Sequence, residues 1–390
     1  MSVATVVFLA LIAFILYVLI GYPLLLSVYA KLFAKPIRKG LEPVRISVVI
    51  PVKNGERWIE GKLRSILASD YPGNLIEILV VSDGSTDSTE TIVRQFGDVR
   101  VRLLSLPPGG KAIAVSQGLK AVTGEIIVLT DVRQTFERDA ISKLVSCFGD
   151  PTVGVVTGEL VIRKGESFEE YNTGLYWTYE KWIRRNLNRI DAMLGATGAI
   201  YAIRASLTEP IPPDILLDDV YLPFVAAFKG YRIYFEDDAK AYDFPTSLQS
   251  EFRRKVRTQA GMYQILARFP QLLWPGNRRF IHFLSHKLGR LLLPFAFLAA
   301  LVSTFFLPQP LMMLAAAGQA LFYGAALVDP LVPERTTLKR LTGVIRAFLV
   351  LVAAALCATA VFFLPAQKLW KETRVSVTGA RATAEERGRS

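Results

Sequence analysis

Histidine and cysteine are both scarce in this chain, which has only two of each among its 390 residues. The cysteines, Cys147 and Cys357, lack the spacing of metal ligands, and Cys357 falls in an apolar run, which argues against a disulfide. The histidines, His282 and His286, form an H-x-x-x-H pattern with no glutamate between them. A histidine-based zinc site and a Ser-His-Asp triad are therefore all but excluded as sources of activity.

Charged side chains are absent from three long apolar segments, at residues 3–30, 291–328 and 347–367. Each is long enough to cross a bilayer, which takes roughly 20 apolar residues. The second segment is too long for one helix, and Pro308 and Pro310 divide it into two. The sequence therefore predicts four membrane-spanning helices, one near the N-terminus and three near the C-terminus.

The distribution of charge around these segments predicts their orientation. No basic residue precedes the first segment and no A-x-A-like site ends it, so it is predicted to be an uncleaved anchor rather than a signal peptide. Much of the net charge of +12 lies in basic clusters at 31–45 and 278–290, which places the central region in the cytosol by the positive-inside rule. Three C-terminal spans would put the basic tail outside, unless one segment is re-entrant or lies on the surface.

The central region alternates short, β-rich apolar runs with segments of helical periodicity. Strands are predicted at 45–52, 76–82, 100–104 and 125–130, with helices at 56–69, 85–96 and 111–122 between them. Nearly continuous apolar strands joined by helices indicate a Rossmann-like, mostly parallel α/β sheet with helices on both faces. Further along, helices are predicted at 166–188, 218–229 and 251–268 and strands at 199–204 and 232–235.

These patterns predict five consecutive parts. They are a transmembrane helix at 1–32, a cytosolic α/β domain at 45–245, an amphipathic interfacial segment at 246–289, transmembrane helices at 290–367 and a tail at 368–390. The interfacial segment contains a basic, amphipathic helix of the kind that lies on a membrane surface.

Polar clusters follow three of the predicted strands, at 53–55, 83–87 and 131–134. Ligands of such sheets bind beyond the carboxyl ends of the strands, so the three clusters are expected to form one site. Asp83 begins a D-G-S-T-D turn in which its carboxylate can accept hydrogen bonds from a ribose or base, and Ser85 is placed to cap the next helix. A capped turn without a ligand is the alternative interpretation.

Three further groups suit phosphate and proton chemistry. The Gly-Gly-Lys segment at 109–111 permits close approach of a phosphate, although a solvated loop lysine explains it equally well. Asp131 follows the most apolar strand, where a carboxylate can hold a Mg²⁺ or Mn²⁺ ion that bridges two phosphates. Asp218 and Asp219 begin a helix, where paired carboxylates either supply a general base or simply favour the helix dipole. Their spacing leaves both interpretations open.

Seven stretches of the sequence occur in a characteristic order. They are VVIPVKNGE (48–56), VVSDGSTD (80–87), GGKAIAVSQGL (109–119), VLTD (128–131), GATGAIYAIR (195–204), LDDVYLPFVAAFKGYR (217–232) and FRRKVRTQAG (252–261). Together they resemble the inverting family 2 glycosyltransferases with an A-type fold, over residues 46–268. The resemblance is to the membrane-bound branch, which includes cellulose, hyaluronan and poly-N-acetylglucosamine synthases and ceramide glucosyltransferases.

The resemblance implies a set of residues that bind the donor. Asp83 would contact the uridine part of a UDP-sugar, with Pro51 and Asn54 beside it, and Lys111 would lie near the diphosphate. Asp131 would occupy the first position of the family's D-x-D motif and would be the protein ligand of Mg²⁺ or Mn²⁺.

On the acceptor side, the resemblance makes Asp219, with Asp218 beside it, the base that deprotonates the acceptor hydroxyl during a single displacement with inversion. Arg254 and Arg257 fall where processive members carry Q-x-x-R-W, near the donor diphosphate and the acceptor exit.

The sequence departs from the family pattern in two places. The metal motif reads D-V-R, so either Arg133 replaces part of the cation or Asp131 holds the metal with help from the donor. In the last motif Arg254 and Thr258 stand in place of Gln and Trp. The sequence therefore favours processive synthesis no more than single transfer to a lipid-linked acceptor.

The predicted function is transfer of a sugar from a nucleotide-sugar, a UDP-sugar by resemblance, to a polysaccharide or lipid-linked acceptor. The expected location is the cytosolic face of a bacterial inner membrane, in contact with lipids and with polysaccharide-assembly partners. The alternative is a catalytically degenerate scaffold of a polysaccharide synthesis complex, which D-V-R supports. A transporter is disfavoured because the spans carry almost no ionisable side chains. Nucleic acid is not an expected partner, since the basic residues cluster at membrane borders.

Overall fold

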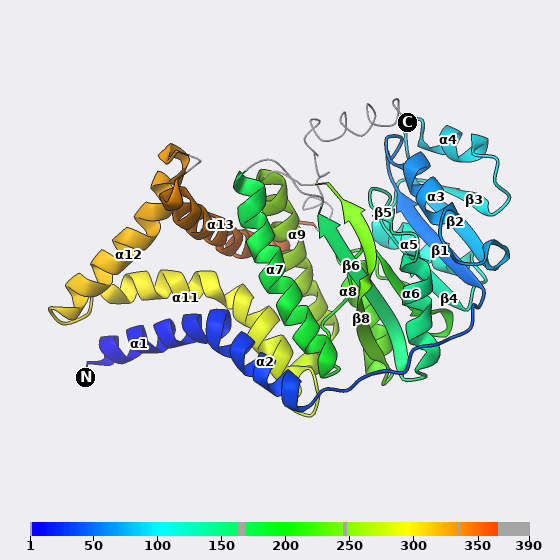
Figure 1. Ribbon diagram of the computed structural model, residues 1–390. Helices are drawn as coiled ribbons and strands as arrows, with labels where there is room; N and C mark the ends of the chain where they lie inside the picture. Colours follow the sequence, from blue (N-terminus) through cyan, green and yellow to red (C-terminus); the bar gives the residue numbers. More distant parts are fainter. Residues whose placement is uncertain (1, 163–167, 245–247, 334–335, 366–390) are drawn as a thin grey trace. The chain divides into compact units, whose positions relative to one another are not determined.

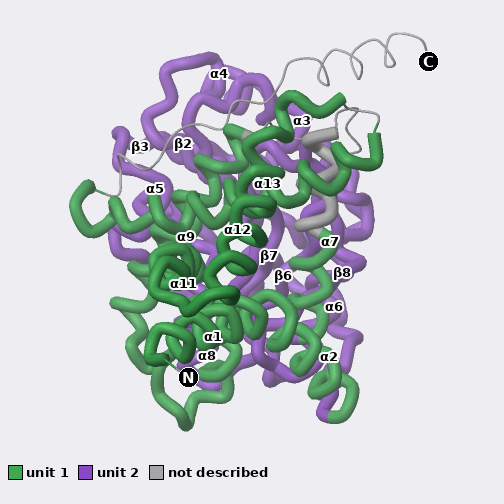
Figure 2. Tube along the Cα trace, turned by 90° about the vertical axis from the view of Figure 1, so that its left-hand side faces the viewer, with its two compact units in different colours: residues 1–32, 164–186, 245–390 green, residues 33–163, 187–244 purple. Residues whose placement is uncertain are grey.

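The structure is a computed structural model that describes residues 2–162, 168–244, 248–333 and 336–365, so the predicted tail at 368–390 lies outside the described residues. The chain divides into two compact units (Figure 2). The sheet unit comprises Phe33–Arg163 and Leu187–Phe244, and the helical unit comprises Met1–Leu32, Lys164–Asn186 and Pro245–Ser390. The helical unit therefore takes in a segment from the middle of the chain as well as both ends.

One eight-stranded sheet forms the framework of the sheet unit, in the order β3-β2-β1-β4-β7-β6-β8-β5 (Figure 1). The strands are β1 (Ile46–Val52), β2 (Ile76–Asp83), β3 (Val101–Leu106), β4 (Ile126–Leu129), β5 (Thr135–Phe136), β6 (Val153–Ile162), β7 (Tyr201–Arg204) and β8 (Arg232–Asp243). Strands β1 to β4 pair in parallel, as do β6 and β8, whereas β7 runs antiparallel to β4 and β6 and β5 antiparallel to β8. The predicted mostly parallel α/β sheet is confirmed.

Helices cover both faces of the sheet. They are α3 (Ile59–Leu67), α4 (Thr89–Gln95), α5 (Lys111–Lys120), α6 (Ala140–Ser146) and α8 (Asp218–Phe228). Successive residues of a strand face opposite sides. On one side, Val48 of β1 shares a core with Leu63 of α3 and Leu144 of α6. On the other side α5 packs so closely that a Cβ on Gly118 would lie 2.7 Å from Val49 Cγ1.

Two details of the predicted elements are wrong. Ser85 does not cap the next helix: its Oγ accepts a hydrogen bond from the Asn54 amide at 3.1 Å, while Asp87 Oδ1 accepts one from Thr89 N at 3.0 Å. The helix therefore begins at Thr89 rather than at residue 85. The strand predicted at 232–235 continues to Asp243. Its pairing with β6 resumes after a register shift, so the acidic run at 236–238, whose composition is typical of a loop, lies within the strand.

Among the described residues of the helical unit, four helices are long and apolar enough to cross a membrane, judged by length and composition. They are Val3–Leu32, Phe280–Thr304, Leu311–Leu331 and Thr337–Phe362, one near the N-terminus and three beyond residue 280, as predicted. The break between the second and third contains Pro308 and Pro310. Within this unit Ile15 and Val18 of the first helix pack against Leu293 and Ala296 of the second.

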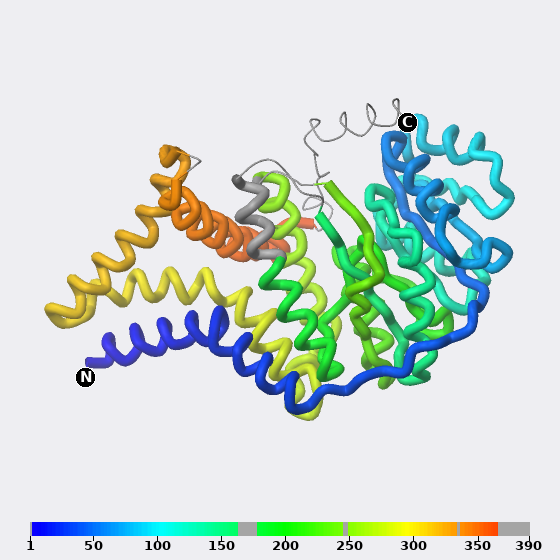
Figure 3. The backbone as a smooth tube through the Cα atoms, in the orientation of Figure 1, coloured from blue at the N-terminus to red at the C-terminus, as the bar shows by residue number. Residues whose placement is uncertain are grey.

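The path of the chain between β6 and β7 leaves the sheet (Figure 3). After Ile162 the chain forms α7 (Phe168–Arg189), most of which groups with the helical unit, and it re-enters the sheet at Tyr201. The returning strand β7 lies between β4 and β6. Residues that precede this excursion in the sequence and residues that follow it therefore lie together at one edge of the sheet.

Candidate active site

Four charged side chains meet beyond the carboxyl end of β4. Asp131 follows this strand, Lys111 is the first residue of α5, and Asp218 and Asp219 are the first residues of α8. Lys111 Nζ lies 2.8 Å from Asp131 Oδ1 and 3.0 Å from Asp218 Oδ1. One ammonium group thus bridges two carboxylates that are far apart in the sequence. These four residues were all singled out by the sequence, and the structure brings them together.

Gly198 lies among these charged groups and was not singled out by the sequence. Its amide donates to Asp219 Oδ2 at 2.8 Å, and its carbonyl accepts from the Asp131 amide at 2.9 Å. A Cβ at this position would lie 3.2 Å from Asp131 Oδ2, 3.4 Å from Asp219 Oδ2 and 3.5 Å from Lys111 Nζ. The absence of a side chain therefore lets the Gly198 backbone lie between Asp131 and Asp219, bonded to the amide of the first and the carboxylate of the second. The only sequence signal was its place in the G-A-T-G motif.

The charges of these groups act strongly on one another because the groups lie close together and Asp218 and most of Lys111 are shielded from water. Burial would lower the pKa of Lys111, but the carboxylates of Asp131, Asp218 and Asp219 outweigh it and raise that pKa above its ordinary value. Burial and the neighbouring Asp218 raise the pKa of Asp219 to about 6, against the opposing effects of Lys111 and of the Gly198 amide. A carboxylate with a pKa near neutrality is suited to accept a proton at physiological pH.

The residues predicted to bind the donor base organise the neighbouring loops. Asp83 Oδ1 accepts hydrogen bonds from the amides of Gly109 at 2.6 Å and Gly110 at 3.0 Å, which fixes the loop that leads into Lys111. Asn54 has a φ of 51° and its Oδ1 accepts the Thr86 amide at 2.8 Å. Pro51 is buried in β1 next to these loops. Contacts of Pro51, Asn54 and Asp83 with a nucleotide stay predictions.

Arg133 is paired with a carboxylate that the sequence did not suggest. Its Nη2 lies 2.5 Å from Asp243 Oδ2, and Gln134 Nε2 donates to the same oxygen at 2.8 Å. Only 3% of the Asp243 side chain is exposed. The positive charge of Arg133 thus compensates a buried carboxylate at the end of β8. This pairing gives the arginine of the D-V-R motif a structural role of its own.

Replacing Arg133 with aspartate is expected to destabilise the protein by about 3 kcal/mol, since removal of one partner leaves a buried charge uncompensated. The new carboxylate would also face Asp243, which adds repulsion. The measurement is thermal and denaturant unfolding of the solubilised protein. Arg64→Asp is the control, because Arg64 is 67% exposed and pairs with Glu60 on the surface of α3. An Arg133→Asp variant of wild-type stability with tighter Mn²⁺ binding would instead make position 133 a metal ligand.

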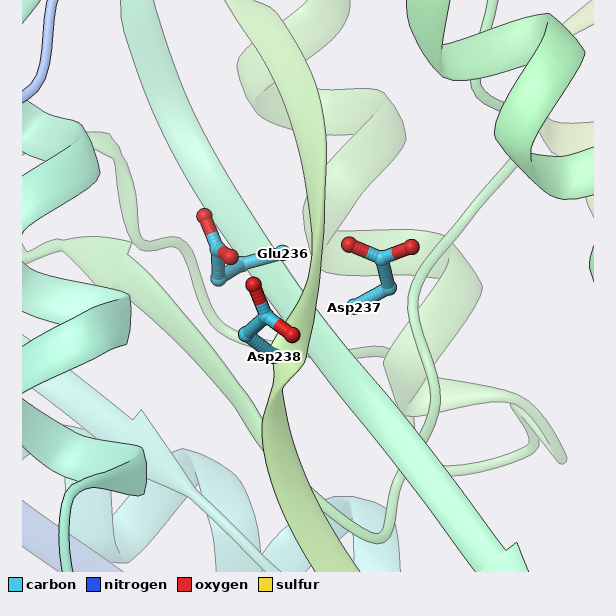
Figure 4. A group of neighbouring side chains, drawn as sticks. All are labelled: Glu236, Asp237 and Asp238. Carbon is cyan, nitrogen blue, oxygen red and sulfur yellow. The ribbon is translucent and has the colours of Figure 1, made fainter.

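An acidic group elsewhere in the sheet unit could also hold a metal ion. Glu236, Asp237 and Asp238 extend from β8 (Figure 4), and one carboxylate oxygen from each lies within 4.8 Å of the others. Glu236 is already engaged, since Lys39 Nζ lies 2.5 Å from its carboxylate and Cys147 Sγ donates to it at 3.2 Å. This group shares no residue with the cluster around Lys111.

Asp131 fits the role of a metal ligand at the cluster. Its side chain is 41% exposed, so it is accessible to a bound ion. Mg²⁺ sites commonly use one or two carboxylates and take the remaining ligands from substrate phosphates and water. One aspartate with a diphosphate donor therefore meets the requirement without a second acidic residue at position 133.

The remaining two predicted donor-binding residues lie in the helical unit. Arg254 and Arg257 are on α9 (Leu248–Arg268), where Arg254 pairs with Glu251. Their predicted place near the donor diphosphate stays a prediction.

Comparisons with known proteins agree with this architecture. Residues 47–209 match the family model of glycosyl transferase family 2. The poly-beta-1,6-N-acetyl-D-glucosamine synthase of Staphylococcus aureus (strain COL) is 25% identical over 273 residues, which are 64% of this chain and 66% of that enzyme. The enzyme of the same name from Staphylococcus epidermidis is 24% identical over 280 residues, 66% of this chain and 67% of that enzyme. The match to the Staphylococcus aureus enzyme thus spans just under two thirds of its length.

Among solved structures, the mannosyltransferase PcManGT from Pyrobaculum calidifontis, in complex with GDP-Man and Mn²⁺, has a TM-score of 0.69 at 24% identity. The superposition covers 91% of this chain and 98% of the mannosyltransferase. This similarity extends the shared fold over nearly the whole chain. The protein therefore has the A-type glycosyltransferase fold, and its residues 47–209 form a glycosyl transferase family 2 domain.

Proposed function

We propose that this chain transfers a sugar from a nucleotide-sugar to an acceptor hydroxyl in a single displacement that inverts the anomeric carbon. The proposal rests on the cluster in which Lys111 bridges Asp131 and Asp218 while Asp219 accepts a hydrogen bond from the Gly198 amide. A cation for the leaving diphosphate and a base for the incoming hydroxyl are thereby held at one edge of the sheet.

Asp219 is the residue to which we assign proton removal. Its Oδ2 is fixed by the Gly198 amide, which leaves Oδ1 to accept the acceptor proton. As that proton leaves, the acceptor oxygen forms a bond to the anomeric carbon, and the bond from this carbon to the phosphate oxygen breaks. The electron pair of the broken bond goes to the nucleoside diphosphate. Attack from the face opposite the leaving group gives inversion.

Lys111 and Asp131 are assigned to the leaving group. The ammonium group of Lys111 can exchange a carboxylate partner for a phosphate oxygen and so stabilise the charge that develops there. Asp131 would hold Mg²⁺ or Mn²⁺, and such an ion neutralises charge on the leaving diphosphate. Arg254 and Arg257 of α9 are proposed to lie near the same diphosphate when the donor is bound.

The donor is proposed to be a UDP-sugar, with Asp83, Asn54 and Pro51 around the base. The acceptor is proposed to be a growing polysaccharide or a lipid-linked sugar at the cytosolic face of a bacterial inner membrane. The relationship to polysaccharide synthases supports the first acceptor class, and the four apolar helices support a membrane location. The complex of the mannosyltransferase with GDP-Man makes GDP-sugars the donors to test alongside UDP-sugars.

The test uses the purified, detergent-solubilised full chain with UDP-N-acetylglucosamine, UDP-glucose and GDP-mannose. Donor binding and nucleotide release are measured with Mg²⁺, with Mn²⁺ and with EDTA. We expect selective binding of one donor, slow release of its nucleotide, and loss of release in EDTA. Folded protein that binds none of these donors would contradict the proposal and favour a catalytically inactive scaffold.

The rate is expected to rise with pH and to reach half its maximum near pH 6. Asp219 accepts a proton only when it is ionised, and its raised pKa of about 6 keeps it protonated in more acidic solution. Because Asp219 interacts with Asp218, this apparent pKa belongs to the pair. The measurement is kcat/KM for the preferred donor between pH 5 and 8 at constant ionic strength. A rate that stays constant down to pH 5 would show that Asp219 does not act as the base.

A further inference from the structure

A lysine is completely buried beneath the candidate active site. Lys62 of α3 has 0% exposure, although lysine is rarely buried without a partner. Its Nζ donates to Thr130 Oγ1 at 2.6 Å and to the Gln134 carbonyl at 2.7 Å, and it lies 3.6 Å from the centre of the Phe136 ring. Burial lowers the pKa of Lys62 well below its usual range, against the charges of Asp131 and Asp243. The proposed mechanism does not use this group.

The two hydrogen bonds of Lys62 reach both ends of one short segment. Thr130 precedes Asp131, and Gln134 follows the D-V-R motif. The side chain of Gln134 is itself held by Asp243. Lys62 therefore connects the two ends of the loop from Thr130 to Gln134. Asp131 is the carboxylate of this loop that contacts Lys111.

The same lysine is linked to the segment that holds Asp219. Lys62 Nζ donates to Thr130 Oγ1, and the Thr130 hydroxyl in turn donates its own proton to the Ala199 carbonyl at 2.7 Å. One residue earlier, Gly198 connects the Asp131 backbone with the Asp219 side chain: its carbonyl accepts from the Asp131 amide and its amide donates to Asp219 Oδ2. The hydrogen bonds thus run from Lys62 through Thr130 to the Gly198–Ala199 backbone, which contacts the Asp131 amide and the Asp219 carboxylate.

We propose that Lys62 is a positioning residue, which fixes the loop bearing Asp131 against the Gly198–Ala199 backbone and so sets the spacing between Asp131 and Asp219. A lysine needed only to fill the core would affect stability alone. A positioning lysine affects the geometry of transfer, because displacement of reacting groups by about 1 Å lowers rates by about 10²-fold.

Lys62→Met tests this inference, since methionine keeps an unbranched side chain and removes the donor. Leu63→Ala is the matched control: Leu63 is the next residue of α3, has 0% exposure and carries no polar group to contact the loop. We expect Lys62→Met to lower kcat by about 10²-fold with donor KM nearly unchanged. Leu63→Ala lowers the melting temperature but leaves kcat of the folded enzyme close to that of the wild type. Equal kcat values for both variants would overturn the proposal.

A second pair of variants applies if Lys62→Met does not fold. Thr130→Val removes the hydroxyl that relays between Lys62 and Ala199, whereas Thr130→Ser keeps it. Thr130→Val is expected to show the loss of kcat, and Thr130→Ser to restore most of it. Equal kcat in these two variants would contradict the relay.

The kcat comparisons rest on the proposed function. A second measurement, which does not depend on activity, is therefore needed. Amide hydrogen exchange is measured in peptides that cover 130–134 and 197–200. Exchange of the Asp131 and Gly198 amides is expected to accelerate in Lys62→Met and not in Leu63→Ala. If the wild type turns over no donor, the proposed function fails while this comparison still decides the role of Lys62. Unchanged protection in Lys62→Met would overturn it.

Discussion

An Asp219→Asn variant is expected to lose transfer by a factor of about 10³ in kcat, within the range that general-base catalysis contributes. Asparagine has nearly the same shape and can still accept the Gly198 amide through its oxygen, so the local backbone is preserved. It cannot take up a proton from the acceptor hydroxyl. Donor binding is expected to stay close to that of the wild type, because the residues assigned to the diphosphate and to the nucleotide base of the donor are unchanged.

Transfer is measured with the preferred donor and donor binding by titration calorimetry on the same preparation. Glu209→Gln is the control, since Glu209 is 45% exposed and pairs with Lys229 on the surface near α8. Retained turnover in Asp219→Asn would remove this residue from the role of base. A loss of donor binding together with turnover would indicate a structural role for the carboxylate instead.

Lys111→Met is expected to lower kcat/KM by about 10²-fold and to move the acidic limb of the pH profile to higher pH. Lys111 is the cation that opposes the rise in the pKa of Asp219. Without it, burial and Asp218 act unopposed by any ammonium charge, so that pKa rises further and less of the base is ionised at neutral pH. The leaving diphosphate also loses a positive partner.

The measurement is the full pH dependence of kcat/KM together with donor affinity at two pH values. Lys120→Met is the matched control, because Lys120 ends the same helix and is exposed. A weaker donor affinity with an unmoved acidic limb would show that Lys111 acts on the donor alone. An unchanged profile and affinity would exclude it from the site.

The sequence predicted the parts of the site that depend on local order. Asp131 could be found because it directly follows an apolar strand, and Lys111 and Asp219 because each begins a helix after a turn. The carboxyl ends of parallel strands meet at one edge, so the β-α alternation predicted that the clusters at 53–55, 83–87 and 131–134 converge, whereas the family resemblance added Lys111 and Asp219 to them.

The remaining parts depend on pairing between distant segments, which leaves no local signal. Gly198 reaches Asp131 only because β7 inserts antiparallel beside β4. Asp243 reaches Arg133 only because β8 continues beyond an acidic run that reads as a loop. Lys62 looks like a surface residue of an amphipathic helix, and only the packing of α3 over the sheet shows that it is buried.

The excursion of the chain between β6 and β7 has a consequence for biosynthesis. A ribosome releases Asp131 and its strand well before Gly198 and Asp219, and β4 and β6 cannot join through β7 until the intervening helix has been translated. Synthesis runs from the N-terminus, so β1 to β4 and the helix that carries Lys111 have been translated before Gly198 and Asp219 exist. A chain whose translation stops within that helix therefore lacks Asp219, the residue proposed as the general base. Such fragments are expected to lack transfer activity even where their sheet has begun to fold.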